Sequence, residues 1–396
     1  MIVREHYLAK IRPFYDSDLI KIITGVRRCG KSVIKDQIEQ ELRAMGKPTL
    51  ALDFERLSVS TQISNAEELV AYITARLGDE KTYVFLDEVQ LVDGWNIACR
   101  SLRLENLSLF VTGSNSKLLS KELTKAFSGR YVSFNIRPFV YKEICEYAQQ
   151  TGNHRTITDY LVYGGFPKTL EFSDSDSILT YLNELDRQIV RNDLMNRYRV
   201  RKEVLFEKLV NFILRSNSRI FSANSVMKFL KGQGYTASIN TIMKYLQYME
   251  DAYIIRSIPQ YDTKAKRELR FFSKIYDEDV AFNSIRQAEH RYDLTHNLEN
   301  IVYNELIYMD YEVSVFKMDG KEIDFYATKN GKSYLVQAAC SIADEETYNR
   351  EFELFKKLDQ THKKIIITTD EIDYSTSTVQ HIKLKDFLQM KELDSL

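Results

Sequence analysis

The sequence predicts a multidomain α/β protein whose N-terminal third is a parallel sheet. Over residues 1 to about 135, short apolar runs alternate with helical stretches, which is typical of a parallel sheet with helices on its faces. From Pro138 to about residue 200 the pattern is helical, and from about residue 293 it runs helix, three strands, helix and strand. With 44% hydrophobic and 12% aromatic residues, the chain can bury sizeable cores.

Five apolar runs are expected to form the first sheet: Leu19–Thr24, Thr49–Phe54, Tyr83–Leu86, Leu107–Thr112 and Tyr131–Ile136. The helical region that follows is interrupted at Tyr163–Pro167, where Gly-Gly-Phe-Pro predicts a sharp loop between helices. Changes of pattern predict four domains. They are an α/β domain (1–137), a helical lid (138–200), a small basic unit (201–275) and a C-terminal αβββαβ domain (276–396).

The loop after the first strand carries the strongest functional signal. Residues Gly25–Ser32 match the pattern G-x-x-x-x-G-K-[ST], with an apolar strand before them and the helical stretch Val33–Met45 after them. Glycines let backbone N–H groups curl around phosphates, and the following helix presents its positive end. Lys31 is expected at the β- and γ-phosphates and the Ser32 hydroxyl on Mg²⁺. The pattern predicts a P-loop that binds ATP with Mg²⁺, and its expected nucleotide-binding residues are Gly25, Val26, Arg27, Arg28, Cys29, Gly30, Lys31, Ser32 and Val33. The side chains of Arg27 and Arg28 are expected to face solvent.

Two acids follow the third expected strand. The run Tyr83–Leu86 ends in Asp87-Glu88, which delivers both carboxylates to the ligand-binding edge of a parallel sheet. We expect Asp87 to hold the Mg²⁺ shell with Ser32, and Glu88 to polarise the attacking water as the catalytic base.

Two further residues are catalytic candidates. The fourth strand ends at Val111-Thr-Gly-Ser-Asn115, where Asn115, rather than Ser114, is expected to orient the water near the γ-phosphate. Arg130 is expected to offset the negative charge that develops in the transition state. The sequence leaves open whether Arg130 acts in its own subunit or in a neighbour.

Residues 201–275 carry 14 Lys or Arg against 6 Asp or Glu, although the whole chain has a net charge of −1. A helix over Phe221–Leu230, a Gly232-Gln-Gly234 turn and a second helix capped by Ser238 predict a winged helix-turn-helix, completed by the strand Tyr253–Ile258 and a basic loop. The second helix is expected to bury Ile239, Ile242, Met243, Leu246 and Met249, and to expose Asn240, Thr241, Lys244, Gln247 and Tyr248.

The sequence allows two interpretations of the function of this unit. In one, the second helix enters a DNA groove while Lys264, Lys266 and Arg267 contact phosphates. In the other, the unit is a packing or oligomerisation module, with a homo-oligomer or a protein partner in place of DNA.

Composition excludes other classes. The cysteines Cys29, Cys99, Cys145 and Cys340 lie far apart, so neither a disulfide framework nor a zinc site is expected. The N-terminus lacks the pattern of a signal peptide, and no stretch approaches the roughly 18 apolar residues that span a bilayer. We therefore expect a cytoplasmic protein with no membrane partner.

Several segments carry a likeness to a known family: Ile23–Ser32, Phe85–Gln90, Trp95, Thr112–Ser116, Gly129-Arg130, Pro138-Phe139, Tyr163–Pro167, Lys274–Asp277 and Leu298–Asn300. Together they resemble a family of prokaryotic AAA-type ATPases of the AAA+ superfamily, and the likeness covers essentially the whole chain. The resemblance implies ATP binding, with an ATPase core followed by a winged helix. It also implies a C-terminal domain of unknown function related to restriction nucleases.

The C-terminal αβββαβ order, with Glu299 on its first helix and Asp324 on its second strand, resembles the PD-(D/E)xK nuclease core. That chemistry needs acids that hold metal and a lysine near the attacking water. The third strand reads Gln337-Ala338-Ala339 where an acid and a lysine belong, and only Lys321 or Lys332 would be available instead. We therefore expect a non-catalytic module.

The sequence leaves two hypotheses about the role of the whole chain. Either an ATP-driven switch acts on DNA or on a DNA-bound partner, or an ATP-controlled signalling or defence scaffold assembles with a protein partner.

Overall fold

The computed structural model describes residues 2–113, 127, 129–262, 267–287, 291–318, 321–356, 358 and 362–395. The chain divides into two compact units. The first comprises Met1–Pro138 with Asp251–Tyr253, and the second comprises Phe139–Glu250 with Ile254–Leu396. Each unit is built around one sheet.

The first unit contains a five-stranded parallel sheet in the order β2-β3-β4-β1-β5. Its strands are β1 (Ile20–Thr24), β2 (Thr49–Asp53), β3 (Thr82–Asp87), β4 (Leu107–Thr112) and β5 (Tyr131–Asn135). All five predicted strands are confirmed, each end lying within one residue of its expected position. Short apolar runs identified them well because β1, β3 and β4 are buried along their whole length.

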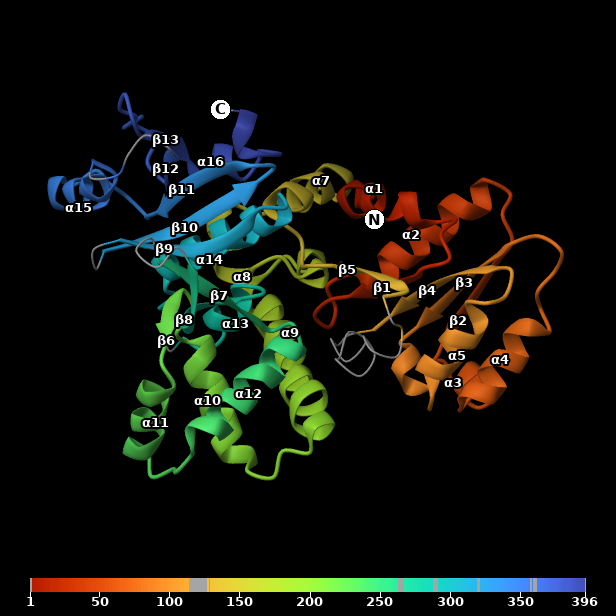
Figure 1. The fold of residues 1–396 in the computed structure, drawn as a ribbon. Coiled ribbons are helices and arrows are strands. Elements are labelled where there is room, and N and C mark those ends of the chain that lie inside the picture. Colours follow the sequence, from red (N-terminus) through yellow and green to blue (C-terminus); the bar gives the residue numbers. More distant parts are fainter. Residues whose placement is uncertain are drawn as a thin grey trace. The chain divides into compact units, whose positions relative to one another are not determined.

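Helices cover both faces of this sheet (Figure 1). On one side lie α1 and α2, and on the other α3, α4 and α5. Their bounds are α1 (Glu5–Ile11), α2 (Lys31–Ala44), α3 (Leu57–Ser60), α4 (Ala66–Thr74) and α5 (Trp95–Leu102), with short 3-10 turns at Arg12–Phe14 and Val89–Leu91.

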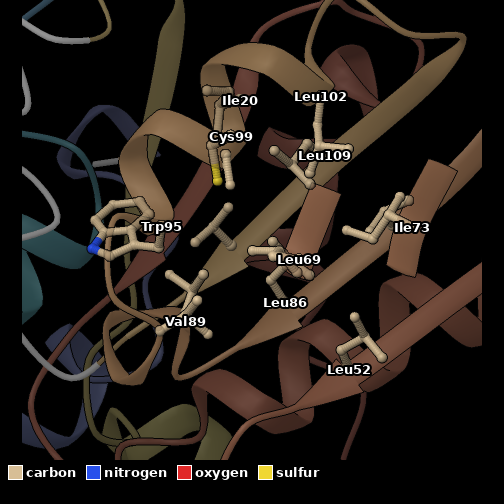
Figure 2. Packing of buried hydrophobic residues seen from close by; sticks show 14 of the residues in the cluster. Ile20, Leu52, Leu69, Ile73, Leu86, Val89, Trp95, Cys99, Leu102 and Leu109 are labelled. Carbon is tan, nitrogen blue, oxygen red and sulfur yellow. The ribbon is translucent and has the colours of Figure 1, made fainter. Parts of the chain in front are cut away.

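The core beneath one face of the sheet is shown in Figure 2. The cluster contains Leu86 of β3 and Leu109 of β4 together with Leu69 and Ile73 of α4, and Leu102, Trp95 and Cys99 of α5 complete it. Burying such side chains is worth roughly 1.5–3 kcal/mol each. This packing fixes the carboxyl ends of the central strands, where the functional residues emerge.

The second unit contains an eight-stranded mixed sheet in the order β13-β12-β11-β10-β9-β7-β8-β6. Its strands are β6 (Arg219–Phe221), β7 (Ile255–Asp262), β8 (Arg267–Asp277), β9 (Glu312–Met318), β10 (Lys321–Lys329), β11 (Lys332–Ala338), β12 (Lys363–Thr368) and β13 (Gln380–Lys383). Strands β7 and β8 form an antiparallel pair, and β7 pairs with β9 in parallel.

The helices of this unit begin with α7 and α8, and α14 lies beside the middle of the sheet (Figure 1). Their bounds are α7 (Tyr141–Thr151), α8 (Ile157–Tyr163), α9 (Ser175–Gln188), α10 (Glu203–Leu214), α11 (Ala223–Gly232), α12 (Ile239–Asp251), α13 (Ala281–Ser284), α14 (Leu294–Tyr308), α15 (Glu345–Lys356) and α16 (Leu384–Phe387). Shorter pieces are the π-helix Ile189–Asn196 and the 3-10 turns Pro167–Glu171 and Leu393–Ser395.

The order α14-β9-β10-β11-α15-β12 matches the predicted αβββαβ pattern, and β13 is added at its edge. The predicted loop at Tyr163–Pro167 also lies between helices. A Cβ on Gly165 would fall 1.8 Å from the carbonyl oxygen of Phe139, so the close backbone approach there requires glycine.

The expected boundary between residues 275 and 276 falls inside β8, and the sheet continues from β6 through to β13. Pattern changes along the sequence gave no sign of this continuity, because the parallel β7–β9 pairing joins strands separated by β8, α13 and α14.

Helix α12 turns a different side to the core from the one expected. Its buried residues are Ile242, Tyr245, Leu246 and Met249, while Ile239 and Met243 are 44% and 46% exposed. The prediction for Ile239 and Met243 was wrong because the stripe that packs starts at Ile242 and has Tyr245, which the prediction left out, at its i+3 position. Its ring meets Phe206 of α10 edge-on, with centroids 4.8 Å apart.

Candidate functional site

The loop between β1 and α2 has the backbone of a phosphate cradle. Gly25, Arg28 and Gly30 all have positive φ, at 144°, 67° and 103°. A Cβ on Gly25 would lie 2.0 Å from the carbonyl oxygen of Ile136, so only glycine fits at the first turn of the loop. Alternation of such conformations turns successive N–H groups inward, which makes a concave site for anions.

Helix α2 begins at Lys31, directly after this loop, with Gly30 as its N-cap. Its first-turn N–H groups and the helix dipole favour a negatively charged ligand at this end. Lys31 is buried, and its ammonium donates to the carbonyl oxygen of Val26 at 3.1 Å. The Ser32 side chain is exposed at the first turn. The cation and the hydroxyl are therefore both held at the loop.

Strand β3 brings Asp87 to the same place. The Ser32 Oγ lies 3.4 Å from Asp87 Oδ1, which also accepts a hydrogen bond from Thr112 Oγ1 at the end of β4. The other carboxylate oxygen, Oδ2, lies 3.2 Å from the ammonium of Lys35. Asp87 is only 5% exposed, so its position is fixed by these three side chains.

Lys35 is a residue that the sequence analysis missed. It lies one turn beyond Lys31 on α2 and is 7% exposed. Burial alone would lower its pKa, but the negative charges of Asp87 and Asp36 raise the pKa of Lys35 above its ordinary value. Its spacing of four residues from Lys31 was the available signal, because side chains four apart share one face of a helix.

Glu88 follows Asp87 in a left-handed conformation, with φ of 52°. Its backbone N–H donates to Thr112 Oγ1 at 3.2 Å, and its carboxylate accepts from the Gln90 amide. A non-glycine residue in this region is uncommon and is often found at functional sites. Thr112 thus contacts both acids, which ties them to the end of β4.

Arg4, in the N-terminal segment, donates hydrogen bonds to the backbone of the loop and of the segment beside it. Arg4 is 2% exposed, and its guanidinium donates to the carbonyl oxygens of Cys29 at 3.2 Å and Arg137 at 3.0 Å. The Cys29 thiol donates to the carbonyl oxygen of Ile136 at 3.2 Å. Sequence reasoning did not single out Arg4, since its partners lie 25 and 133 residues away.

The other predicted nucleotide-binding and catalytic residues differ in their exposure, and two of them are not described. Val33 is half-buried on α2, Arg27 is half-buried and Arg28 is exposed. Asn115 and its alternative Ser114 lie outside the described residues. The exposure of Arg28 agrees with the expected solvent-facing orientation, whereas the half-burial of Arg27 agrees with it only in part.

The structure does not bring Arg130 to the loop of its own chain. Its carbonyl oxygen accepts from the N–H of Ile20, at the start of β1, whereas the loop leaves the opposite end of that strand. Five residues of strand place these two ends about 16 Å apart. A role at the site of its own chain is therefore disfavoured, and the alternative of a neighbouring subunit stays a prediction.

The donors at the loop fit Mg²⁺. This ion takes oxygen ligands and is usually bound through one or two carboxylates, phosphates and waters. A hydroxyl and a carboxylate 3.4 Å apart beside a phosphate cradle supply such a set. In the described part of the chain, no cluster of three or more His, Cys, Asp or Glu side chains could hold a metal ion by itself.

A second polar cluster lies in the eight-stranded sheet. Lys274 of β8 is 5% exposed, and its ammonium lies 2.7 Å from Glu299, 3.0 Å from Glu322 and 3.1 Å from Asp324. Burial alone would lower the pKa of Lys274, but these carboxylates raise it. Burial and the charge of Asp324 raise the pKa of Glu299 to about 8.

We expected Asp324, with Glu299 as its only acidic companion, to lack a nearby lysine, and that expectation was wrong. Three carboxylates and a lysine meet here, and the lysine comes from β8 instead of the third strand of the αβββαβ pattern. Of the alternatives, Lys332 pairs with Asp394. Gln337 holds the backbone, because its side-chain oxygen accepts from the N–H of Asp324 at 3.1 Å. The Lys274–Asp277 segment had been noted only as part of the family likeness.

No helix among the described residues has both the length and the apolarity needed to cross a membrane.

Comparison with known proteins agrees with this geometry. A family model described as an AAA domain matches residues 17–145, and a domain of unknown function, DUF8612, matches residues 154–285. A Walker-type ATPase of Pyrococcus abyssi has a similar fold, with a TM-score of 0.51 and 14% identity over 72% of this chain and 96% of that one.

Two curated relatives extend over nearly the whole chain. An uncharacterized protein of Haemophilus influenzae is 33% identical over 93% of both chains. An uncharacterized protein of Methanocaldococcus jannaschii is 28% identical over 89% of this chain and 82% of its own.

Residues 17–145 match the AAA domain model, and the five-stranded parallel sheet with its loop has the fold of a P-loop ATPase. The chain belongs to the same protein family as the Haemophilus influenzae protein, with which it aligns over 93% of its length.

Proposed function

We propose that this chain binds ATP with Mg²⁺ at the β1–α2 loop and hydrolyses it. The observation that carries the proposal is the convergence of Ser32 and Asp87, 3.4 Å apart, at the mouth of a glycine-formed loop. The neighbouring Glu88 stands at the same strand end. Bound Mg²⁺ would neutralise phosphate charge and orient the γ-phosphate.

Each described residue of the site has a role that its position supports. The loop N–H groups and the start of α2 bind the phosphates, and Lys31, now turned to the Val26 carbonyl, extends to the β- and γ-phosphates. Ser32 and Asp87 hold the ion. Glu88 accepts the proton of the attacking water, and its fixed backbone orients the carboxylate. Asn115 is proposed to orient that water.

Glu88→Gln tests the proposal directly. The amide preserves the size of the side chain but cannot accept a proton. The variant should therefore bind a fluorescent ATP analogue with parental affinity while phosphate release falls about 100-fold or more. Lys31→Ala is the companion variant, in which nucleotide binding itself should be lost. Parental turnover by Glu88→Gln would show that Glu88 is not the base.

The ATP cycle is proposed to act on a partner through a winged helix formed by α10, β6, α11, α12 and the β7–β8 pair. Strand β6 pairs antiparallel with β8, beside the helices, as such a unit requires. Duplex DNA is favoured as the partner, because Asn240, Lys244 and Gln247 of α12 are exposed in a basic part of the chain. Tyr248 is less available, since it stacks on Tyr198 with centroids 3.7 Å apart.

Fluorescence anisotropy of a labelled duplex, titrated with the full chain at several salt concentrations, tests this choice. DNA binding should weaken with salt, and Lys244→Glu should weaken it further, whereas the exposed Lys391→Glu serves as a charge-matched control. Equal binding by both variants, or none by the parental chain, would favour a protein partner. The exposed Ile239 and Met243 would then be the contact residues to test.

A further inference from the structure

The carboxylate expected to hold Mg²⁺ already has a cation. Both oxygens of Asp87 are engaged, Oδ1 by the hydroxyls of Ser32 and Thr112 and Oδ2 by the ammonium of Lys35 at 3.2 Å. The side chains of Lys35 and Asp87 are only 9% and 6% exposed. Solvent therefore screens this pair weakly, and the attraction between the two charges is strong.

Mg²⁺ and Lys35 make competing demands on this carboxylate. A divalent ion that reaches Asp87, directly or through its waters, is attracted by the negative charge that the Lys35 ammonium now partly neutralises. A buried ammonium 3.2 Å from Asp87 also repels a divalent cation at the same place. Loading of the ion is therefore favoured when Lys35 moves or gives up part of its contact.

The structure also supplies a second partner for Lys35. Asp36 Oδ1 lies 3.0 Å from the same ammonium, and the side chain of Asp36 is 51% exposed. A lysine side chain has four rotatable bonds, so a small rotation toward solvent would exchange one carboxylate for the other. The carboxylate of Asp36 can therefore pair with the Lys35 ammonium when that ammonium leaves Asp87.

We propose that Lys35 is the resident cation of the magnesium site. It holds Asp87 in the nucleotide-free protein, gives way to Mg²⁺ by moving toward Asp36, and so sets the metal concentration at which the site loads. The inference rests on the proposed Mg-ATP binding and adds regulation by free magnesium. Lys35 acts through Asp87 and is therefore a positioning residue.

Mn²⁺ titration of the full chain, in the presence of excess ADP, tests the role of Lys35. Free Mn²⁺ is followed by its electron paramagnetic resonance signal, which requires no turnover, and the contribution of Mn-ADP alone is subtracted. Lys35→Met keeps the length of the side chain without its charge and should lower the half-saturating Mn²⁺ concentration about tenfold. Lys35→Arg should stay within about threefold of the parental value, because the charge is retained.

Asp36→Asn provides a test in the opposite direction at an exposed position that is expected to leave folding intact. Without Asp36, Lys35 loses its alternative partner, so the half-saturating Mn²⁺ concentration should rise several-fold. Circular dichroism confirms that each variant is folded before titration.

Each outcome has a distinct meaning. Equal Mn²⁺ midpoints in folded Lys35→Met and the parental protein would overturn the role of Lys35, as would weaker metal binding in Lys35→Met. Failure of the parental chain to bind ADP at any Mn²⁺ concentration would instead refute the proposed nucleotide site.

Discussion

Removing the ammonium of Lys274 should strongly destabilise the second unit. Lys274→Met keeps most of the side-chain volume but leaves the carboxylates of Glu322 and Asp324 without their cation, beside the buried Glu299. Loss of one partner from a buried ion pair typically costs about 3–5 kcal/mol, because the remaining charge is uncompensated. For a unit of this size, each kcal/mol lowers Tm by about 2–4 °C, so Tm should fall by about 6–20 °C.

Lys364→Met is the matched control for this variant. Lys364 is also 5% exposed, but its ammonium donates to the carbonyl oxygens of Phe355 and Leu358, at 3.0 and 2.9 Å. Its loss leaves unsatisfied carbonyls but no group of like charges, and should cost about 1–3 kcal/mol. Thermal unfolding followed by circular dichroism compares the two variants.

A second substitution separates the two cases. Adding Asp324→Asn to Lys274→Met should restore part of the lost stability, since one uncompensated charge is removed. A Tm of Lys274→Met within 2 °C of the parental value, or no recovery of Tm on adding Asp324→Asn, would refute the reasoning.

Three further outcomes are expected. Burial raises the pKa of Glu299 to about 8, so the folded state binds this proton more tightly than the unfolded state does. The free energy of unfolding should therefore fall as pH rises from about 4.5 to 8. In urea titrations, Glu299→Gln should make this free energy less dependent on pH over that range. Arg130→Ala should slow ATP turnover without changing nucleotide affinity if Arg130 serves a neighbouring subunit, and parental activity should then rise with protein concentration; unchanged kinetics would remove it from the mechanism. Supercoiled DNA should not be nicked with Mg²⁺ or Mn²⁺, because Lys274 occupies the centre of the carboxylate cluster where a metal ion would bind. Asp324→Ala should also leave the ATPase rate nearly unchanged. Metal-dependent nicking that disappears in Asp324→Ala would contradict the first expectation.

The first unit could be predicted closely because its information is local. Each buried strand is a short apolar run, and the loop, its lysine and its serine are consecutive in the chain. Asp87 and Glu88 follow their strand directly, and parallel strands deliver their carboxyl ends to one edge. Lys35 was missed because a lysine on a helix is usually solvated; its spacing from Lys31 places it on the same helix face, and its contact with Asp87 shows that it is buried there.

The second unit was less predictable because its contacts join distant segments. Lys274 meets Glu299, Glu322 and Asp324 only when β8 and β10 enter the same sheet beside α14. No spacing rule links a lysine on one strand to acids 25 to 50 residues later. The spacing of apolar residues correctly predicted that α12 is an amphipathic helix. The spacing alone did not decide which of two adjacent sides of the helix faces the core.

The continuous sheet of the second unit limits where the chain can be divided. Strands β7 and β9 are joined by main-chain hydrogen bonds, so in a fragment that ends near residue 275 strand β7 would lose its partner β9. The remaining piece would expose the edge of β9. Unpaired strand edges accept strands from other molecules and promote aggregation. Truncated forms that separate residues 201–275 from the C-terminal region should therefore be poorly soluble, and a cut near Pro138 offers the better place to separate the chain.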